Sequence, residues 1–132
     1  MMQEEFNEIF VKYHEIITLG VYGTSIALLL IGLYAVLIKK NLVKIVIGLS
    51  IFDAGIHLLF VGIGYIKGGT APIFSPGYEN AANRMVDPVP QALVLTAIVI
   101  GFAVTSVALS LIIRLYKHHN TAKIDQIKSL KW

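Results

Sequence analysis

Residues 87–114 have the sequence DPVPQALVLTAIVIGFAVTSVALSLIIR, in which residues 92–113 form an uncharged run of about 22 residues that ends at Arg114. A helix rises about 1.5 Å per residue, so about 20 apolar residues cross the hydrocarbon core of a bilayer. Asp87 is a favoured N-cap and Pro88 suits the first turn of a helix. The sequence therefore predicts a transmembrane helix over about residues 89–116.

Two further apolar runs are long enough to cross a membrane. The first covers about residues 18–38, and the second covers about residues 42–66. In lipid, backbone amides must be hydrogen-bonded within a helix or between the strands of a closed barrel, so each run is expected to be helical. We therefore predict an all-α integral membrane protein with three transmembrane helices, in a single membrane domain that covers residues 1–132.

The composition favours a membrane protein over a soluble domain. Of the 132 residues, 56% are hydrophobic and only 14% are charged, and the mean hydropathy is +0.74. The chain contains no cysteine, which excludes disulfides, thiolate zinc sites and cysteine-ligated clusters within it. The net charge of +3 comes from basic residues beside the apolar runs, so it indicates membrane orientation and no nucleic-acid partner is expected.

The distribution of Lys and Arg predicts which side of the membrane each segment occupies. The segment before the first run is acidic, whereas the connection between the first two runs and the tail, residues 117–132, are basic. The long loop of residues 67–86 is close to neutral. Because inner segments carry the excess of Lys and Arg, the N-terminus and this loop are expected outside and the tail inside. The expected location is the cell (plasma) membrane, as a multi-pass protein.

Asp53 and His57 are the ionisable residues expected within the membrane. An ionised residue at the centre of a transmembrane helix costs roughly 2.5–3.5 kcal/mol on insertion scales, so such residues are functional candidates. Ser50 shares their helix face, and Lys44 lies about two turns earlier. These four residues are the candidates for a proton or cation path. Two alternatives stay open: Asp53 and His57 form a polar contact that only joins helices, and Lys44 only snorkels to the membrane surface.

Small residues indicate the faces on which helices pack. Gly48, Gly55 and Gly62 recur every seven residues on a face nearly opposite Asp53. Gly101 belongs to a series of small residues in the third run. Such residues let the backbones of transmembrane helices approach closely. The hydroxyl side chains of the third run are expected to bond back to their own helix.

No residue pattern of an enzyme active site is present. The sequence contains no nucleophile–base pair, phosphate-binding loop or metal cluster, so no catalytic residue, cofactor or metal is expected. Three helices enclose very little, and carriers are built from repeats around a central site. Asp53 and His57 would face lipid in an isolated chain, so partner subunits are expected in addition to the bilayer.

The start of the third run resembles a known family. Residues 87–100, DPVPQALVLTAIVI, strongly resemble the motif of the C subunit of Mrp-type multisubunit sodium/proton antiporters. The motif residues are Asp87, Pro88, Pro90, Gln91 and Thr96. The short segments Gly48-Leu49, His57-Leu58-Leu59 and Gly69-Thr70-Ala71-Pro72 follow in the spacing of that family. The resemblance covers roughly residues 18–130 and extends more distantly to the K subunit of respiratory complex I.

The resemblance implies a non-catalytic subunit that packs beside a large antiporter-like subunit and helps to line its intramembrane ion path. As an alternative, the same subunit occurs in ferredoxin-driven respiratory complexes such as membrane-bound hydrogenases, with hydrogenase or ferredoxin-oxidising subunits as partners. Complex I K subunits carry glutamates where this chain has Ser50 and, approximately, Gly101, so their paired-glutamate relay cannot be transferred. Asp53 is a peculiarity of this chain and lies one turn from Ser50.

Two other classes of membrane protein stay open as alternatives. A haem-binding anchor needs two axial histidines within the bilayer, and His57 is the only histidine in the three runs. A small exporter that works as a homo-oligomer would use Asp53 as its coupling acid. Haem absorbance would identify the first class, and purification without partner subunits would identify the second.

Overall fold

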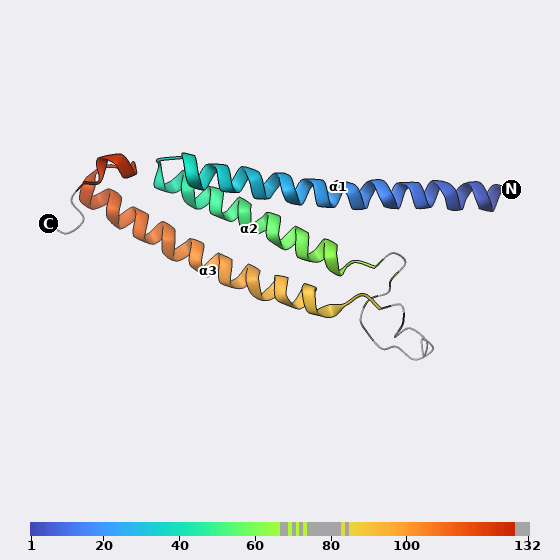
Figure 1. Cartoon of the computed structure of the whole chain (residues 1–132). Helices are drawn as coiled ribbons and strands as arrows, with labels where there is room; N and C mark the ends of the chain where they lie inside the picture. The colour runs from blue at the N-terminus through green and yellow to red at the C-terminus, as the bar shows by residue number, and fades with distance from the viewer. Residues whose placement is uncertain (67–68, 70, 72, 74–82, 84, 129–132) are drawn as a thin grey trace.

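The computed structural model describes residues 1–66, 69, 71, 73, 83 and 85–128. In this part of the chain the elements are α1 (Met2–Ile38), α2 (Leu42–Gly64), α3 (Pro88–His119) and a short 3-10 turn, η2 (Ile124–Gln126). Figure 1 shows α2 lying alongside both α1 and α3. The predicted all-α class with three long helices is confirmed. Most of the predicted loop 67–86, and the tail residues 129–132, lie outside the described residues.

The three helices are each long and apolar enough to cross a membrane. Few of their residues are buried within the chain: among the described residues, the buried hydrophobic side chains are those of Val86, Val94 and Ile112. Large apolar side chains instead cover the outside of all three helices. Such a surface is stable in contact with lipid or other subunits rather than water. The chain is therefore a multi-pass membrane protein.

Helix α1 is longer than the predicted first span. It contains 37 residues and is therefore about 55 Å long, whereas the hydrocarbon core of a bilayer is about 30 Å thick. The predicted span, residues 18–38, occupies its C-terminal part, and the N-terminal part extends past the ends of α2 and α3 (Figure 1). Glu4 and Glu5 lie in the first turn, where carboxylates interact favourably with the helix dipole.

Side-chain caps define where α2 and α3 begin. The Asn41 side chain accepts a hydrogen bond from the backbone N–H of Val43 at 3.0 Å. As expected from the sequence, the Asp87 side chain caps α3, accepting from the N–H of Val89 at 3.0 Å. Helix α2 ends at Gly64, two residues before the end of the predicted run, because the backbone of Tyr65 is extended.

The glycine face of α2 packs against α1. A Cβ placed on Gly48 would lie 2.6 Å from the Cβ of Ala35, and one placed on Gly55 would lie 3.0 Å from the backbone N of Leu29. At Gly62 the nearest α1 atom would be 3.4 Å away, an ordinary contact. The two backbones are therefore closest near the end of α1, and only residues without a side chain fit at that approach.

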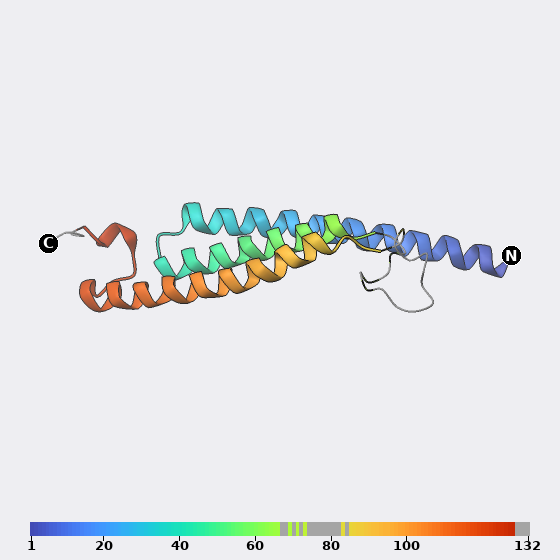
Figure 2. The ribbon, with the colours of Figure 1, turned by 90° about the horizontal axis from the view of Figure 1, so that it is seen from below.

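The C-terminal tail returns from the end of α3 to the connection between α1 and α2 (Figures 1 and 2). The N–H of Leu42 donates to the carbonyl of Ala122 at 2.9 Å, and the N–H of Ile124 donates to the carbonyl of Lys40 at 2.9 Å. The Lys40 ammonium lies 2.7 Å from the Asp125 carboxylate. The hydrogen bond that the Lys40 ammonium donates to Asp125, and the attraction between the two charges, raise the pKa of Lys40 above its ordinary value.

Candidate functional site

Ser50, Asp53 and His57 line one cavity between α2 and α3, with a volume of about 290 Å³. The three residues are one helical turn apart, so they share a face of α2. All three are half-buried. The remaining lining residues are Ala54 from α2 and Ile98, Gly101, Phe102 and Thr105 from α3. The structure thus brings three of the four predicted path residues together.

Gly101 of α3 faces the carboxylate of Asp53. A Cβ placed on Gly101 would lie 3.5 Å from Oδ2 of Asp53. The sequence pattern predicts a helix-packing role for Gly101, and in the structure this glycine faces a carboxylate rather than an apolar ridge. At 3.5 Å a methyl group would make an ordinary van der Waals contact, so Gly101 borders the carboxylate of Asp53 without being required for its position.

The side chains of Asp53 and His57 have no hydrogen-bond partner in the part of the chain that the structure describes. Within the described residues, neither side chain makes a hydrogen bond or an ion pair, to the other or to a third group. By contrast, the hydroxyl of Ser50 donates to the carbonyl of Val46 at 3.1 Å. The hydroxyls of Thr96 and Ser106 also bond to carbonyls of their own helix, as predicted from the sequence. No described residue therefore competes with water, ions or a partner subunit for the carboxylate and the imidazole.

A second cavity, of about 530 Å³, lies between α2 and α3 and is also lined by Asp53 and His57. Its other lining residues are apolar: Leu49, Ile56, Phe60, Leu93, Val94, Ala97, Ile100, Gly101 and Val104. The two side chains therefore border both cavities at the interface of α2 and α3.

Lys44 does not belong to this site. Its side chain is exposed, and it lines a different cavity with residues of the α1–α2 connection and the tail. The reason is geometric, because Lys44 lies in the first turn of α2 while Ser50 begins the polar face nearly two turns later. The structure therefore places Lys44 at the end of the bundle rather than next to Asp53.

Pro90, a residue of the motif at the start of α3, packs against the C-terminal end of α2. A Cβ placed on Gly64, the last residue of α2, would lie 3.0 Å from the Cβ and Cγ of Pro90. Gln91 and Thr96 are exposed on α3, where they are accessible to another subunit. The packing role of Gly64 was not predicted, because Gly64 is outside the seven-residue series of glycines.

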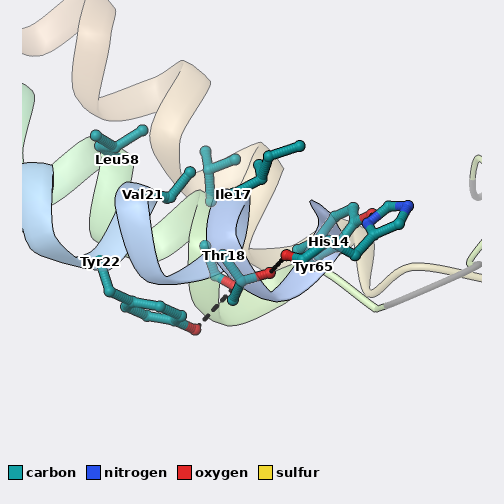
Figure 3. Close-up of a pocket in the computed structure, with 9 residues that line it drawn as sticks. His14, Ile17, Thr18, Val21, Tyr22, Leu58 and Tyr65 are labelled. Atoms are coloured by element: carbon teal, nitrogen blue, oxygen red, sulfur yellow. Dashed lines mark hydrogen bonds between the residues drawn. The ribbon is translucent and has the colours of Figure 1, made fainter. Parts of the chain in front are cut away.

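A third cavity, of about 250 Å³, lies between α1 and the C-terminal end of α2 (Figure 3). The hydroxyl of Tyr22 donates to the carbonyl of Gly62 at 3.0 Å, and the hydroxyl of Tyr65 lies 3.5 Å from Nδ1 of His14. His14 was not predicted as a cavity residue because it precedes the predicted span. The sequence feature that could have indicated this cavity is the presence of aromatic residues near the end of an apolar run. No group of three possible metal ligands occurs among the residues that the structure describes.

Comparisons with known proteins identify relatives along most of the chain. Residues 20–132 match the protein family described as NADH-ubiquinone/plastoquinone oxidoreductase chain 4L. The sequence is 41% identical to the C subunit of the Na⁺/H⁺ antiporter of Bacillus subtilis (strain 168) over 92 residues, which are 70% of this chain and 78% of that protein. It is 40% identical to the corresponding Na⁺/H⁺ antiporter protein of Alkalihalophilus pseudofirmus over 105 residues, which are 80% and 89% of the two chains.

Two solved complexes contain chains of similar structure. One is the membrane-bound sulfane sulfur reductase, an archaeal respiratory membrane complex, with a TM-score of 0.74 and 56% identity over 83% of this chain and 97% of that chain. The other is the Mrp complex from Dietzia sp. DQ12-45-1b, with a TM-score of 0.67 and 27% identity over 84% and 80% of the two chains.

Proposed function

Because the chain belongs to the NADH-ubiquinone/plastoquinone oxidoreductase chain 4L family and is a relative of Na⁺/H⁺ antiporter C subunits, we propose that it is a non-catalytic membrane subunit of a multisubunit sodium/proton antiporter. The identity of about 40% over most of the chain carries this proposal. The exposed apolar faces of all three helices fit a subunit that is surrounded by lipid and by other membrane subunits. A large antiporter-like subunit is the expected neighbour.

Within that complex, Asp53 and His57 help to line the path of the ions. Three facts support this role: both side chains are half-buried, both line the cavities between α2 and α3, and neither is used in an internal hydrogen bond among the described residues. A carboxylate can hold a proton or a cation, and an imidazole exchanges protons near neutral pH. Ser50, whose hydroxyl oxygen can still accept a hydrogen bond, extends the polar face by one turn.

Replacement of Asp53 by Asn tests the path directly. Asn keeps the shape and the hydrogen bonding but cannot titrate, so the complex should assemble while cation-coupled proton transport in liposomes falls. Asp53→Glu should restore part of the transport. Ser106→Ala, which removes an exposed hydroxyl bonded to its own helix, is the matched control and should transport normally. Normal antiport by an intact Asp53→Asn complex would mean that Asp53 only contributes to packing.

The orientation of the chain follows from its charges. We place the N-terminus outside and the tail inside the cell, because the inner side of a membrane protein carries the excess of Lys and Arg. The basic connection between α1 and α2 and the basic tail lie at the same end of the helices, which supports a single inner face. The acidic N-terminal part of α1 lies at the other end (Figure 1).

A second candidate is the same subunit role inside a respiratory membrane complex that carries a redox arm. The specific observation in its favour is the 56% identity to a chain of the archaeal sulfane sulfur reductase complex, against 27% to the chain of the Mrp complex. Purification from the native membrane in mild detergent separates the two candidates. Co-purifying iron–sulfur or hydrogenase-like subunits would support the respiratory complex, and antiporter subunits alone would support the free-standing antiporter.

A further inference from the structure

A cavity of about 390 Å³ lies at the end of the bundle where α1 ends and α2 begins. Its walls come from two segments that are about 80 positions apart in the sequence. The lining residues are Lys39, Lys40, Asn41, Lys44, Lys123, Asp125 and Gln126. The paired backbones of Asn41 and Lys123 hold the two segments together. The cavity therefore results from the fold of the tail and is not simply a charged stretch of the sequence.

The charges that line this cavity are not balanced. Four lysines and a single carboxylate line it, and the carboxylate, Asp125, is paired with Lys40. This is the one ion pair among the residues that the structure describes. Lys39 lies over the ring of Tyr34 at 5.8 Å, while Lys44 and Lys123 have no acidic partner in the described part of the chain. Several cations around one cavity create a positive potential that attracts an anion.

The position of the cavity relative to the membrane limits what this anion can be. Lys39 directly follows the last residue of α1, and Lys44 lies in the first turn of α2. The apolar span of α1 ends just before Lys39, and the apolar span of α2 begins near Lys44. The cavity therefore lies at the depth where the hydrocarbon core gives way to phospholipid headgroups. Basic pockets at this depth recognise the phosphates of anionic headgroups, and long lysine side chains reach them by snorkelling.

We propose that this cavity binds the phosphate of an anionic phospholipid headgroup, and that the bound lipid links the tail to the α1–α2 connection. Lys39 and Lys44 contact the phosphate from the helix ends, and Lys123 contacts it from the tail. The site is separate from the cavities at Asp53 and does not depend on the chain being an antiporter subunit. It requires only that this end of the bundle faces a leaflet that contains anionic lipid.

The test measures lipid binding by the purified complex after delipidation. The probe is phosphatidylglycerol, offered in phosphatidylcholine vesicles, with vesicles of phosphatidylcholine alone as the reference. Each lysine near an anionic headgroup contributes roughly a fivefold factor in affinity. Lys44→Gln and Lys123→Gln should therefore each weaken the binding of phosphatidylglycerol about fivefold. Lys39→Gln, which leaves the tail unchanged, should also weaken the binding of phosphatidylglycerol.

Lys128→Gln is the matched control, because it removes the same charge from an exposed position that does not line the cavity. This variant should bind phosphatidylglycerol like the parent protein. An equal loss in the control would mean that only the diffuse charge of this face attracts the lipid, which would overturn the proposal. A second arm adds inorganic phosphate to the phosphatidylglycerol-containing vesicles. If free phosphate competed with the lipid at equimolar concentration, the site would be one for soluble phosphate instead.

Discussion

Replacement of Gly48 by Ala tests how closely α1 and α2 approach. The added methyl group would lie 2.6 Å from the Cβ of Ala35, 3.2 Å from the carbonyl oxygen of Gly32 and 3.3 Å from the backbone N of Val36. Carbon atoms prefer a separation of roughly 3.5–4.0 Å. Neither the Cβ of Ala35 nor the backbone atoms can rotate away, so the two helices must separate or bend.

The size of the effect follows from two opposing contributions. Overpacking of a close contact typically costs about 1–3 kcal/mol. Ala is better than Gly inside a helix by roughly 0.5–1 kcal/mol. The free energy that holds α1 against α2 should therefore fall by about 0.5–2 kcal/mol, which is about a 2- to 30-fold change in equilibrium constant. Gly32→Ala should be at least as damaging, because its methyl would lie 2.6 Å from the backbone N of Phe52.

The assay is reversible unfolding of the purified complex in mixed micelles, with the SDS concentration at the midpoint as the readout. Two other glycines serve as graded controls. Gly62→Ala meets only ordinary contacts at 3.4 Å or more, and Gly20→Ala has no atom within 4 Å. We expect the midpoint to be unchanged or slightly raised for both controls and lowered for Gly48→Ala. The close approach of α1 and α2 is refuted if Gly48→Ala unfolds at the midpoint of the parent protein, or if Gly20→Ala is equally destabilised.

Three further predictions concern the tail and its side of the membrane. The hydrogen bonds on either side of Asn41 and Lys123 make them a non-hydrogen-bonded antiparallel pair, whose Cα atoms are typically about 4.5 Å apart; cysteines at both positions should form a disulfide on mild oxidation, and failure to crosslink would mean that the tail lies elsewhere. The pKa of Lys40 is raised by Asp125. The ion pair therefore stabilises the contact between the tail and the α1–α2 connection fully at pH values below the ordinary lysine pKa, and this stabilisation is lost only as the pH rises through the higher pKa of the folded protein. Spin-label distances between the connection and the tail should accordingly stay constant through neutral pH and increase at strongly alkaline pH, and should increase already at neutral pH in Asp125→Asn. A cysteine at Asn120 should be labelled by an impermeant reagent from the inner side of the membrane, and labelling from the outer side would reverse the proposed orientation.

Much of the secondary structure could be predicted from local sequence. Three apolar runs of sufficient length indicate three membrane helices, because the free energy of placing each residue in lipid adds up along the run. The cap at Asp87 and the back-bonded hydroxyls of α3 follow from contacts within four residues. The shared face of Ser50, Asp53 and His57 also follows, because a helix advances by about 100° per residue whatever its neighbours are.

The pairing of the helix faces was decided by the tertiary structure. Periodicity indicates that α2 has a glycine face and a polar face, but only packing shows that the first meets α1 and the second meets Gly101 of α3. Periodicity likewise does not show that Lys44 shares a cavity with Lys123 of the tail. These contacts join residues that are tens of positions apart, and they depend on how the surfaces of separate helices fit together. The pattern within a single helix specifies which residues share a face, whereas the complementary surface of another helix determines what that face contacts.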